Sequence, residues 1–303
     1  MKRSFKIGTR GSKLSLVQAN EVRERLLRAC GERFDFEIQI IKTTGDKMPE
    51  LPLAAPLHKG LFTKELETAL RAGTIDLAVH SCKDLPTELE DDLCIAAVLP
   101  RLSVRDVLIL KEGMTPTFSS LPAGSAIFTS SPRRELQWLA RHPQTRVLPI
   151  RGNIDTRLQK LRNYAGNAGL LLAEAGILRL QPSLDGLRVF PLSLEEMLPS
   201  PGQGALAIEA LKSNAEACEA AASVNDVSSE KQVRAERAFL HAMGGGCRAP
   251  IAAYARPVSD NAAALQLDAI VFKGAHGLLK TMSGEEPEIL GKNLAKEFLG
   301  DII

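Results

Sequence analysis

Strand-like and helix-like segments alternate along the first two-thirds of the chain, and this order constrains the fold more than any other feature. Residues 5–9 and 36–40 have the pattern of strands, and between them apolar residues recur at helical spacing from Leu16 to Leu27. A helical pattern at 62–70 and a strand at 75–79 continue the series. Strands that alternate with helices are typical of a mostly parallel sheet covered on both faces, so we expect an α/β fold.

A second series of the same kind begins near Asp106. The segment 199–204, Pro-Ser-Pro-Gly-Gln-Gly, interrupts it, and these turn-forming residues predict a crossing point or hinge. Beyond Asn225 the pattern changes to one typical of a small α+β domain. The second series has predicted strands at 107–110, 126–128 and 169–173 and a helix at 134–141; the last part has a strand at 265–272 and a helix near 289–299.

The composition argues against several classes of function. The net charge is +2 and only 4% of the residues are aromatic, which argues against a nucleic-acid-binding surface and a membrane-bound polycation. No stretch approaches the ~20 apolar residues of a membrane span, and the first residues lack the apolar core of a secretory signal. The five cysteines are scattered without Cys-x-x-Cys spacing, so we expect a reducing cytoplasm, no disulfide framework and no metal site.

Three consecutive glycines at 244–246 precede a single cysteine, Cys247. They either cap the preceding helix, with an incidental thiol behind them, or leave space around a thiol that something bulky has to reach. Because Cys247 follows a helix C-terminus, where the macrodipole disfavours a thiolate, the position favours an anchoring role over that of an attacking nucleophile.

The strand at 75–79 leads into a polar cluster that ends before a proline. Ligands bind at the C-terminal ends of strands in open α/β sheets, where Lys83 can hold an anion and Asp84 a cation. The alternative is a surface ion pair of small worth. Alternation along a strand would place Cys82 and Lys83 on opposite faces, so we expect Cys82 to be packed rather than reactive.

Six arginines lie at the ends of predicted elements. A guanidinium matches carboxylates and phosphates in bidentate fashion, and helix N-termini favour anions. In a chain of nearly neutral charge these arginines together predict a polyanionic small molecule as ligand, although a solvated surface role is the alternative for any one of them. Close to the first, Gln18 either forms a capping box with Ser15 or contacts a ligand. The arginines are Arg10, Arg133, Arg134, Arg151, Arg157 and Arg179.

Seven segments, taken in order, resemble the hydroxymethylbilane synthase (porphobilinogen deaminase) family. They cover nearly the whole chain, with spacing comparable to that of the family. The segments are 7–12 (Ile-Gly-Thr-Arg-Gly-Ser), 58–66 (His-Lys-Gly-Leu-Phe-Thr-Lys-Glu-Leu), 78–86, 129–134, 151–157, 201–205 and 235–238 leading to 245–247.

The resemblance implies a transferase of porphyrin and heme biosynthesis. Such an enzyme condenses four porphobilinogen molecules head to tail, releases ammonia and yields the linear tetrapyrrole hydroxymethylbilane. The family builds this product on a dipyrromethane cofactor, held by a thioether to the cysteine that matches Cys247, and its catalytic aspartate matches Asp84. Each porphobilinogen carries an acetate and a propionate, which accounts for the arginines. The alternative is a cytoplasmic two-domain clamp that binds a small polycarboxylate without catalysis, but it gives Cys247 and Asp84 no purpose.

The same resemblance assigns the remaining site residues by position. Phe128, Pro132, Glu174 and Gly244 depart from the family's usual residues, which bears on ligand contacts rather than on catalytic groups. The residues matched to cofactor binding are Cys247, Lys83, Ser131, Arg133 and Arg134, and those matched to substrate binding are Arg10, Ser12, Arg151, Arg157 and Arg179.

The family's fold consists of two periplasmic-binding-protein-like α/β domains that flank a cleft, plus a small C-terminal α+β domain that carries the cysteine loop. We place domain 1 at residues 1–101 and 200–219, domain 2 at 106–195 and domain 3 at 224–303. We expect a cytoplasmic monomer whose partner is porphobilinogen, with no nucleic acid and no membrane.

Overall fold

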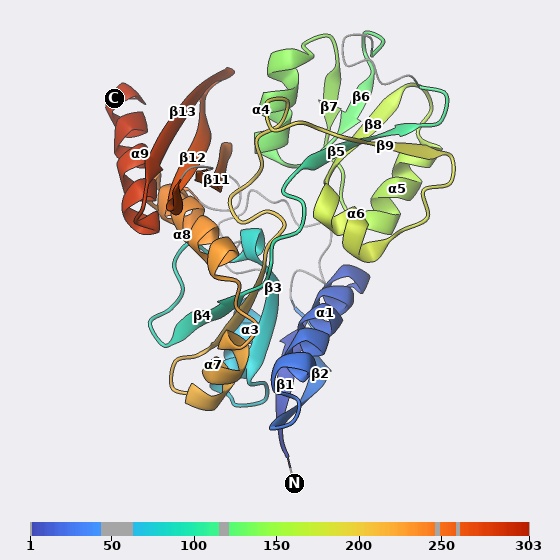
Figure 1. Cartoon of the computed structure of the whole chain (residues 1–303). Coiled ribbons are helices and arrows are strands. Elements are labelled where there is room, and N and C mark those ends of the chain that lie inside the picture. Colours follow the sequence, from blue (N-terminus) through green and yellow to red (C-terminus); the bar gives the residue numbers. More distant parts are fainter. Residues whose placement is uncertain (1, 44–62, 115–120, 246–248, 259–260, 303) are drawn as a thin grey trace. The chain divides into compact units, whose positions relative to one another are not determined.

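The computed structural model describes residues 2–43, 63–114, 121–245, 249–258 and 261–302 (Figure 1). The chain divides into two compact units, each built from two separate stretches. The first unit comprises Met1–Leu102 and Ala205–Val233, and the second comprises Ser103–Gly204 and Arg234–Ile303. The predicted crossing at 199–204 therefore ends where the chain returns to the first unit, while the predicted division into three domains stays a prediction.

A five-stranded sheet forms the centre of the first unit, in the order β2-β1-β3-β10-β4. Helices α1 and α7 bury side chains such as Val22 and Ala217 against one face. Helix α3 buries Leu66 and Leu70 in a second apolar cluster. The elements are β1 (Arg3–Thr9), α1 (Lys13–Cys30), β2 (Phe34–Ile40), α3 (Lys64–Arg71), β3 (Leu77–Ser81), β4 (Leu93–Val98), β10 (Leu206–Leu211) and α7 (Ala215–Ala222).

The second unit contains another five-stranded sheet, in the order β7-β6-β8-β5-β9. Leu158 of α5 and Ile177 of α6 join one apolar cluster of this sheet, and Trp138 of α4 joins the other. The elements are β5 (Asp106–Lys111), β6 (Ala126–Phe128), α4 (Pro132–Arg141), β7 (Arg146–Leu148), α5 (Ile154–Asn163), β8 (Ala168–Ala173), α6 (Glu174–Leu180) and β9 (Leu187–Pro191).

A three-stranded antiparallel sheet, β11-β12-β13, follows towards the C-terminus. Helices α8 and α9 supply its core, in which the rings of Phe239 and Phe298 lie 5.5 Å apart between centroids. The elements are α8 (Val227–Ala242), β11 (Ile251–Val258), β12 (Asn261–Lys273), β13 (His276–Gly284) and α9 (Pro287–Ile302). This arrangement confirms the α/β class and the small α+β part at the C-terminus.

The expectation of mostly parallel sheets is wrong, because both five-stranded sheets are mixed. Strand β10 pairs antiparallel with β3 and with β4, and β5 pairs antiparallel with β8 and with β9. A crossover helix makes consecutive strands parallel, but neither β10 nor β5 reaches its neighbours through one. Each enters its sheet after the chain has crossed from the other unit, so its direction is set by the point of entry.

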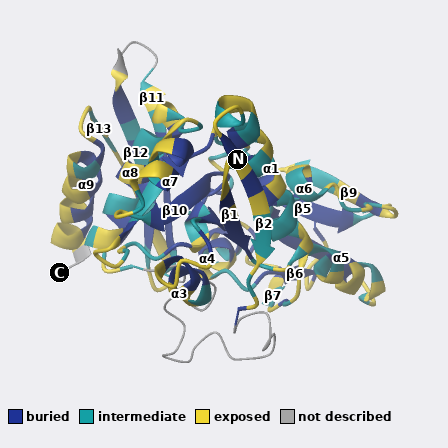
Figure 2. Cartoon of the chain, turned by 90° about the horizontal axis from the view of Figure 1, so that it is seen from below, coloured by how far each residue is buried: buried dark blue, intermediate teal, exposed yellow. Residues whose placement is uncertain are grey.

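The two antiparallel insertions are buried over all but their last residue (Figure 2). Strand β5 buries Asp106 and β10 buries Glu209, each with no exposed surface. A carboxylate in such a setting requires a partner, since burial without one is costly. The partners of these two carboxylates organise much of the candidate site.

Candidate functional site

The proposed catalytic residue Asp84 lies on a short turn directly after β3. The turn is a single 3-10 helix, Cys82–Asp84, and Leu85 follows in the extended conformation that a residue before proline prefers. Cys82 and Leu85 are buried in one apolar cluster, while the Asp84 side chain is exposed and Lys83 is half-buried. Cys82 is packed, as the sequence predicts, but the reason is this turn rather than alternation along a strand.

Two contacts hold the end of β3 from different elements of the first unit. The backbone N–H of Cys82 donates to the carbonyl of Ala205 at 3.0 Å. The buried Gln18 of α1 donates through Nε2 to Oγ of Ser81 at 2.8 Å. The carboxylate of Asp84 therefore projects from a turn whose base is attached to neighbouring chain on two sides, which limits the entropy lost when it meets a ligand.

Ser12, matched to substrate binding, is the N-cap of α1 in this structure. Its Oγ accepts from the backbone N–H of Ser15 at 3.1 Å and lies 2.7 Å from the Ser15 hydroxyl. The capping box between Ser15 and Gln18 is therefore wrong, because Ser12 caps the helix and Gln18 contacts Ser81 instead. Arg10 lies half-buried directly after β1.

Sequence reasoning missed the pair formed by His80 and Glu209 behind the Asp84 turn. Nε2 of His80 lies 3.0 Å from Oε2 of Glu209, and the side chains are 5% and 0% exposed. The register pairs Ala207 with His80, which places both side chains on the same face of the sheet. A glutamate inside the otherwise apolar segment 205–211 was the one signal of it in the sequence.

Arg133 and Arg134, matched to cofactor binding, converge on Asp106 within the second unit. NH2 of Arg133 lies 2.7 Å from Oδ2 of Asp106, and Nε and NH2 of Arg134 donate to Oδ1 at 3.1 and 2.8 Å. Gln203 donates to the same oxygen at 2.9 Å. Both guanidiniums also donate to main-chain carbonyls, of Leu198 and Leu171 respectively. Neither Asp106 nor Gln203 was singled out from the sequence as a site residue.

This cluster has a surplus of positive charge in a buried place. Arg133 and Arg134 are 3% and 7% exposed, and Asp106 is 0% exposed. Burial lowers the pKa of Arg133, an effect that Asp106 opposes and Arg134 reinforces. Two cations share one carboxylate in the part of the chain that the structure describes. The donor set therefore fits a ligand that brings carboxylates of its own, as a dipyrromethane with acetate and propionate groups does.

Ser131 precedes these arginines as the N-cap of α4. Its Oγ accepts from the backbone N–H of Arg134 at 3.5 Å, and its own N–H donates to Oγ1 of Thr129 at 3.1 Å. The departure at Pro132 suits the first turn of a helix, where a missing N–H costs nothing. The departure at Phe128 fills the core, where its ring meets that of Tyr164 edge-on, 5.1 Å between centroids.

The remaining arginines matched to substrate binding lie half-buried near helix ends of the second unit. Gly152 has a φ of +111°, a conformation that favours glycine, and its carbonyl accepts from Nε of Arg157 at 2.8 Å. The carbonyl of Arg151 accepts from Lys160 at 3.1 Å. Arg179 donates to the carbonyl of Gly204 at 3.3 Å.

The departure at Glu174 lies at the first position of α6. There its carboxylate accepts from the hydroxyl of Ser103, and its backbone N–H donates to the carbonyl of Arg105. An acidic residue at a helix N-terminus interacts favourably with the macrodipole. Glu174 therefore has a local stabilising role within the second unit.

Gly244 and Gly245 form the end of α8, whereas Gly246, Cys247 and Arg248 lie outside the described residues. Gly244 has a φ of +65°, and its N–H donates to the carbonyl of His241 at 2.8 Å. The N–H of Gly245 donates to the carbonyl of Leu240 at 3.0 Å, and the two hydrogen bonds together form a Schellman cap. A Cβ on Gly245 would come within 2.7 Å of the Leu240 side chain. Capping and packing thus account for these two glycines, and clearance for a ligand stays a prediction.

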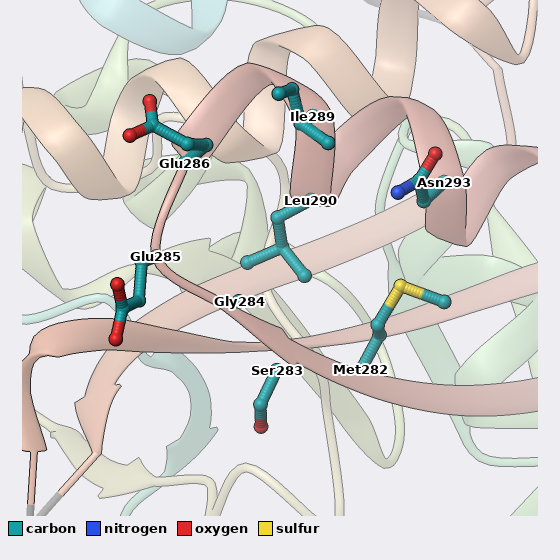
Figure 3. Close-up of a pocket in the computed structure, with 8 residues that line it drawn as sticks. All are labelled: Met282, Ser283, Gly284, Glu285, Glu286, Ile289, Leu290 and Asn293. Atoms are coloured by element: carbon teal, nitrogen blue, oxygen red, sulfur yellow. The ribbon is translucent and has the colours of Figure 1, made fainter.

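A hollow of about 360 Å³ lies between β13 and α9, and none of the residues that line it is predicted for the site (Figure 3). Its lining includes Glu285 and Glu286 and no arginine or lysine. Negative charge at its rim disfavours a polycarboxylate. Among the described residues, no group of three or more His, Cys, Asp or Glu side chains could hold a metal ion, and no helix is long and apolar enough to cross a membrane.

The predicted site residues group by unit. Arg10, Ser12, Lys83 and Asp84 belong to the first unit; Ser131, Arg133, Arg134, Arg151, Arg157 and Arg179 belong to the second. Within the first unit, Lys83 and Asp84 share one turn, and within the second Arg133 and Arg134 share one carboxylate. The exposed acid Asp84 thus belongs to the first unit together with two cations, Arg10 and Lys83, and the other predicted cations belong to the second.

Comparison with known proteins supplies the family. Residues 5–219 match the family model described as porphobilinogen deaminase, dipyromethane cofactor binding domain, and residues 231–300 match its C-terminal domain. A porphobilinogen deaminase of Geobacillus sp. (strain WCH70) is 45% identical over 97% of this chain and 93% of its own length. One of Rubrobacter xylanophilus is 41% identical over 97% and 93%. Among solved structures, a TRAP periplasmic solute binding protein of Desulfovibrio salexigens is 8% identical, with a TM-score of 0.44. The match covers 74% of this chain and 73% of that chain, and the similarity is too low to transfer fold or function. The two family models and the curated relatives together place this chain in the porphobilinogen deaminase family.

Proposed function

We propose that this chain condenses four porphobilinogen molecules head to tail into hydroxymethylbilane, with Asp84 as its catalytic carboxylate. As a member of the porphobilinogen deaminase family, it is a transferase of tetrapyrrole and heme biosynthesis that uses a dipyrromethane cofactor. The observation that carries the proposal for Asp84 is its place on a short, exposed turn whose base is buried and hydrogen-bonded to neighbouring elements.

The chemistry of the substrate explains why a carboxylate is needed there. Loss of ammonia from the aminomethyl group of porphobilinogen leaves an electron-poor azafulvene cation. The carboxylate of Asp84 can accept a hydrogen bond from the pyrrole N–H and so stabilise the positive charge as it develops. The carboxylate is not consumed in this step. The same group can move a proton when the new carbon–carbon bond has formed. Lys83, next to it on the turn, is suited to pair with a carboxylate of the cofactor.

The cationic residues of the second unit provide the matching recognition. Arg133 and Arg134 would hold carboxylates of the cofactor, with Ser131 at the start of the same helix, because Asp106 balances one of their two charges. Arg151, Arg157 and Arg179, together with Arg10 and Ser12 of the first unit, would hold the acetate and propionate groups of the substrate and the growing chain.

Cys247 is the proposed point of attachment, through a thioether. The cofactor, when bound, supplies the pyrrole carbon to which the first substrate unit is joined. The chain's own contribution at this point is the sharp end of α8, where the cap at Gly244 and Gly245 stops the helix just before the cysteine. We also propose the division into domains at 1–101 with 200–219, 106–195 and 224–303, and a monomer that works in the cytoplasm.

The test combines the mass of the protein with its turnover. We expect the purified protein to exceed its sequence mass by one dipyrromethane, to react with Ehrlich's reagent and to convert porphobilinogen into hydroxymethylbilane. Cys247→Ala should abolish the mass excess. Asp84→Asn should keep the mass excess and lose at least about a hundredfold in kcat, the scale of one lost electrostatic contact in a transition state.

The matched control for Asp84 is Glu88→Gln, which changes another exposed acid shortly after the turn. Its kcat should stay within about twofold of the parent protein, as for surface changes away from a site. Full turnover in Asp84→Asn would reject the role of Asp84. A bare polypeptide mass together with no turnover would favour the clamp that binds a polycarboxylate without catalysis.

A further inference from the structure

Two cysteines of the first unit lie side by side, away from the proposed catalytic turn. Cys94 is on β4 and Cys218 is on α7, and these two elements pack together (Figure 1). The Sγ atoms are 4.0 Å apart. Both residues are half-buried, so a small reagent can reach them while bulk contact with other proteins is restricted. The separation is close to van der Waals contact between two sulfur atoms, whereas a disulfide would bring them to ~2.05 Å.

Each of the two thiols donates to a main-chain carbonyl in the reduced protein. The Cys94 thiol donates to the carbonyl of Ala210 at 3.7 Å, and the Cys218 thiol donates to that of Leu211 at 3.4 Å. Burial, reinforced by the neighbouring Cys218, raises the pKa of the Cys94 thiol to about 11. Because the thiolate is the reactive form, this shift lowers the reactivity of Cys94 at neutral pH.

The other described cysteines lack such an arrangement. Cys82 is 1% exposed within an apolar cluster. Cys30 donates to the carbonyl of Leu26 at 3.2 Å and accepts from the hydroxyl of Ser223 at 3.8 Å. Cys30 has the same intermediate burial as Cys94 and Cys218 and lies in the same unit, so it is a matched control.

We propose that Cys94 and Cys218 form a modification site, a paired thiol that a two-electron oxidant of the peroxide class converts into an intramolecular disulfide. One of the two sulfurs loses its proton and attacks the peroxide, the O–O bond breaks, and that cysteine becomes a sulfenic acid while one water is released. The other sulfur then attacks the sulfenic sulfur, loses its proton, and expels the oxygen as a second water. Two thiols are oxidised and one peroxide is reduced to two waters.

The bond would join the two stretches of chain that make up the first unit. Cys94 belongs to Met1–Leu102 and Cys218 to Ala205–Val233, and their positions differ by 124 in the sequence. Cross-links that close long loops remove much freedom from the unfolded chain, so the disulfide should raise the thermal midpoint of the first unit. No residue assigned to the cofactor or the substrate takes part, so turnover should survive the oxidation.

The experiment treats the full-length holoenzyme with hydrogen peroxide, blocks remaining thiols with N-ethylmaleimide and maps peptides without reduction. We expect a cross-linked peptide pair that contains Cys94 and Cys218, a mass lower by two hydrogens, and reversal by dithiothreitol. The thermal midpoint of the first unit should rise by about 4 °C. Hydrogen exchange of the β4 and β10 peptides, measured at increasing temperature, reports this midpoint. Cys94→Ser and Cys218→Ser should each abolish the cross-link and the rise, and Cys30→Ser should retain both.

A second measurement needs no oxidant and no variant. Phenylarsine oxide binds two neighbouring thiols and releases one water, so reduced protein should bind one equivalent and lose the maleimide reactivity of Cys94 and Cys218 together. The proposal is overturned if peroxide converts the two residues to separate sulfinic acids. It is equally overturned if Cys30 supplies the partner sulfur, or if phenylarsine oxide protects neither residue.

Discussion

The two buried carboxylates of the five-stranded sheets, Glu209 and Asp106, have different charge balances. Glu209 contacts one basic side chain, that of His80, in a one-to-one pair. Asp106 contacts two guanidiniums, which do not give up their protons. Among the described residues, the buried carboxylate of the first sheet thus has one basic partner and that of the second sheet has two, which leaves one positive charge there for an anionic ligand.

Removal of the carboxylate at Asp106 should have the largest effect. Asp106→Asn leaves Arg133 and Arg134 as buried cations without their shared carboxylate, and the free energy of unfolding should fall by about 3–5 kcal/mol. Trp138, the only tryptophan of the sequence, lies in the core of this unit and reports its unfolding in urea. The exposed Asp91→Asn is the control and should cost less than about 0.5 kcal/mol. Equal losses in the two variants would show that the surplus charge has no energetic weight.

Removal of the cofactor should come next. If the surplus charge is balanced by a ligand carboxylate, Cys247→Ala should destabilise the second unit by about 2–3 kcal/mol, the worth of one charged hydrogen bond. The urea midpoint of Trp138 fluorescence measures the loss, with Cys30→Ser as the matched change of a cysteine. If the urea midpoint of Cys247→Ala equals that of the parent protein, a carboxylate of the cofactor does not balance the surplus charge at Arg133 and Arg134.

Loss of the contact between His80 and Glu209 in the first unit should lower the free energy of unfolding by less. Glu209→Ala leaves His80 buried without its partner and should cost about 1–3 kcal/mol, seen as faster hydrogen exchange in the β3 and β10 peptides. Because the two side chains depend on each other, the double variant with His80→Ala should cost less than the sum of the single changes. Strict additivity would mean that the contact contributes nothing and that the comparison with Asp106 is misplaced.

The smallest effect is a pH dependence at His142, which ends the helix that carries Arg133 and Arg134. Burial, helped by Arg141, lowers the pKa of His142 below its usual value of 6.5, so the folded protein prefers the neutral ring. The unfolded chain binds the proton more readily, and this contribution to stability is present above pH 6.5 and is lost as the pH falls below it. His142→Gln should therefore reduce the acid sensitivity of the Trp138 midpoint between pH 7 and 5. An unchanged pH profile would assign the sensitivity to other groups.

Much of the local structure could be predicted from periodicity, because it depends on neighbouring residues. The predicted strands at 5–9, 36–40, 107–110 and 126–128 and the helix at 134–141 all lie within observed elements. No local pattern predicted strand β10 or its antiparallel direction, although the family resemblance placed residues 200–219 in the first domain. Both depend on where a chain that has crossed to another unit returns, and no local pattern contains that information.

In the candidate site, too, some residues could be predicted from the sequence, whereas their contacts could not. Asp84 and Arg133 could be predicted as chemically important because acids and guanidiniums at element ends are unusual locally. Their supports could not, since Glu209 meets His80 across 129 residues and Gln203 meets Asp106 across 97. A single sequence identifies residues with chemical potential but not the pairs they form. One signal of these pairs was present in the sequence: an acidic residue at the start of an apolar strand, as at Asp106, or within one, as at Glu209.

The central place of β10 in the first sheet determines when the proposed catalytic turn can form during synthesis. Ala205 accepts from the N–H of Cys82, and β10 separates β3 from β4. A ribosome makes Asp84 early, yet the strand that anchors its turn appears only after the whole stretch Ser103–Gly204 of the second unit has been made. A nascent chain that stops within that stretch therefore contains every catalytic atom proposed for the first unit but cannot complete the sheet that positions them.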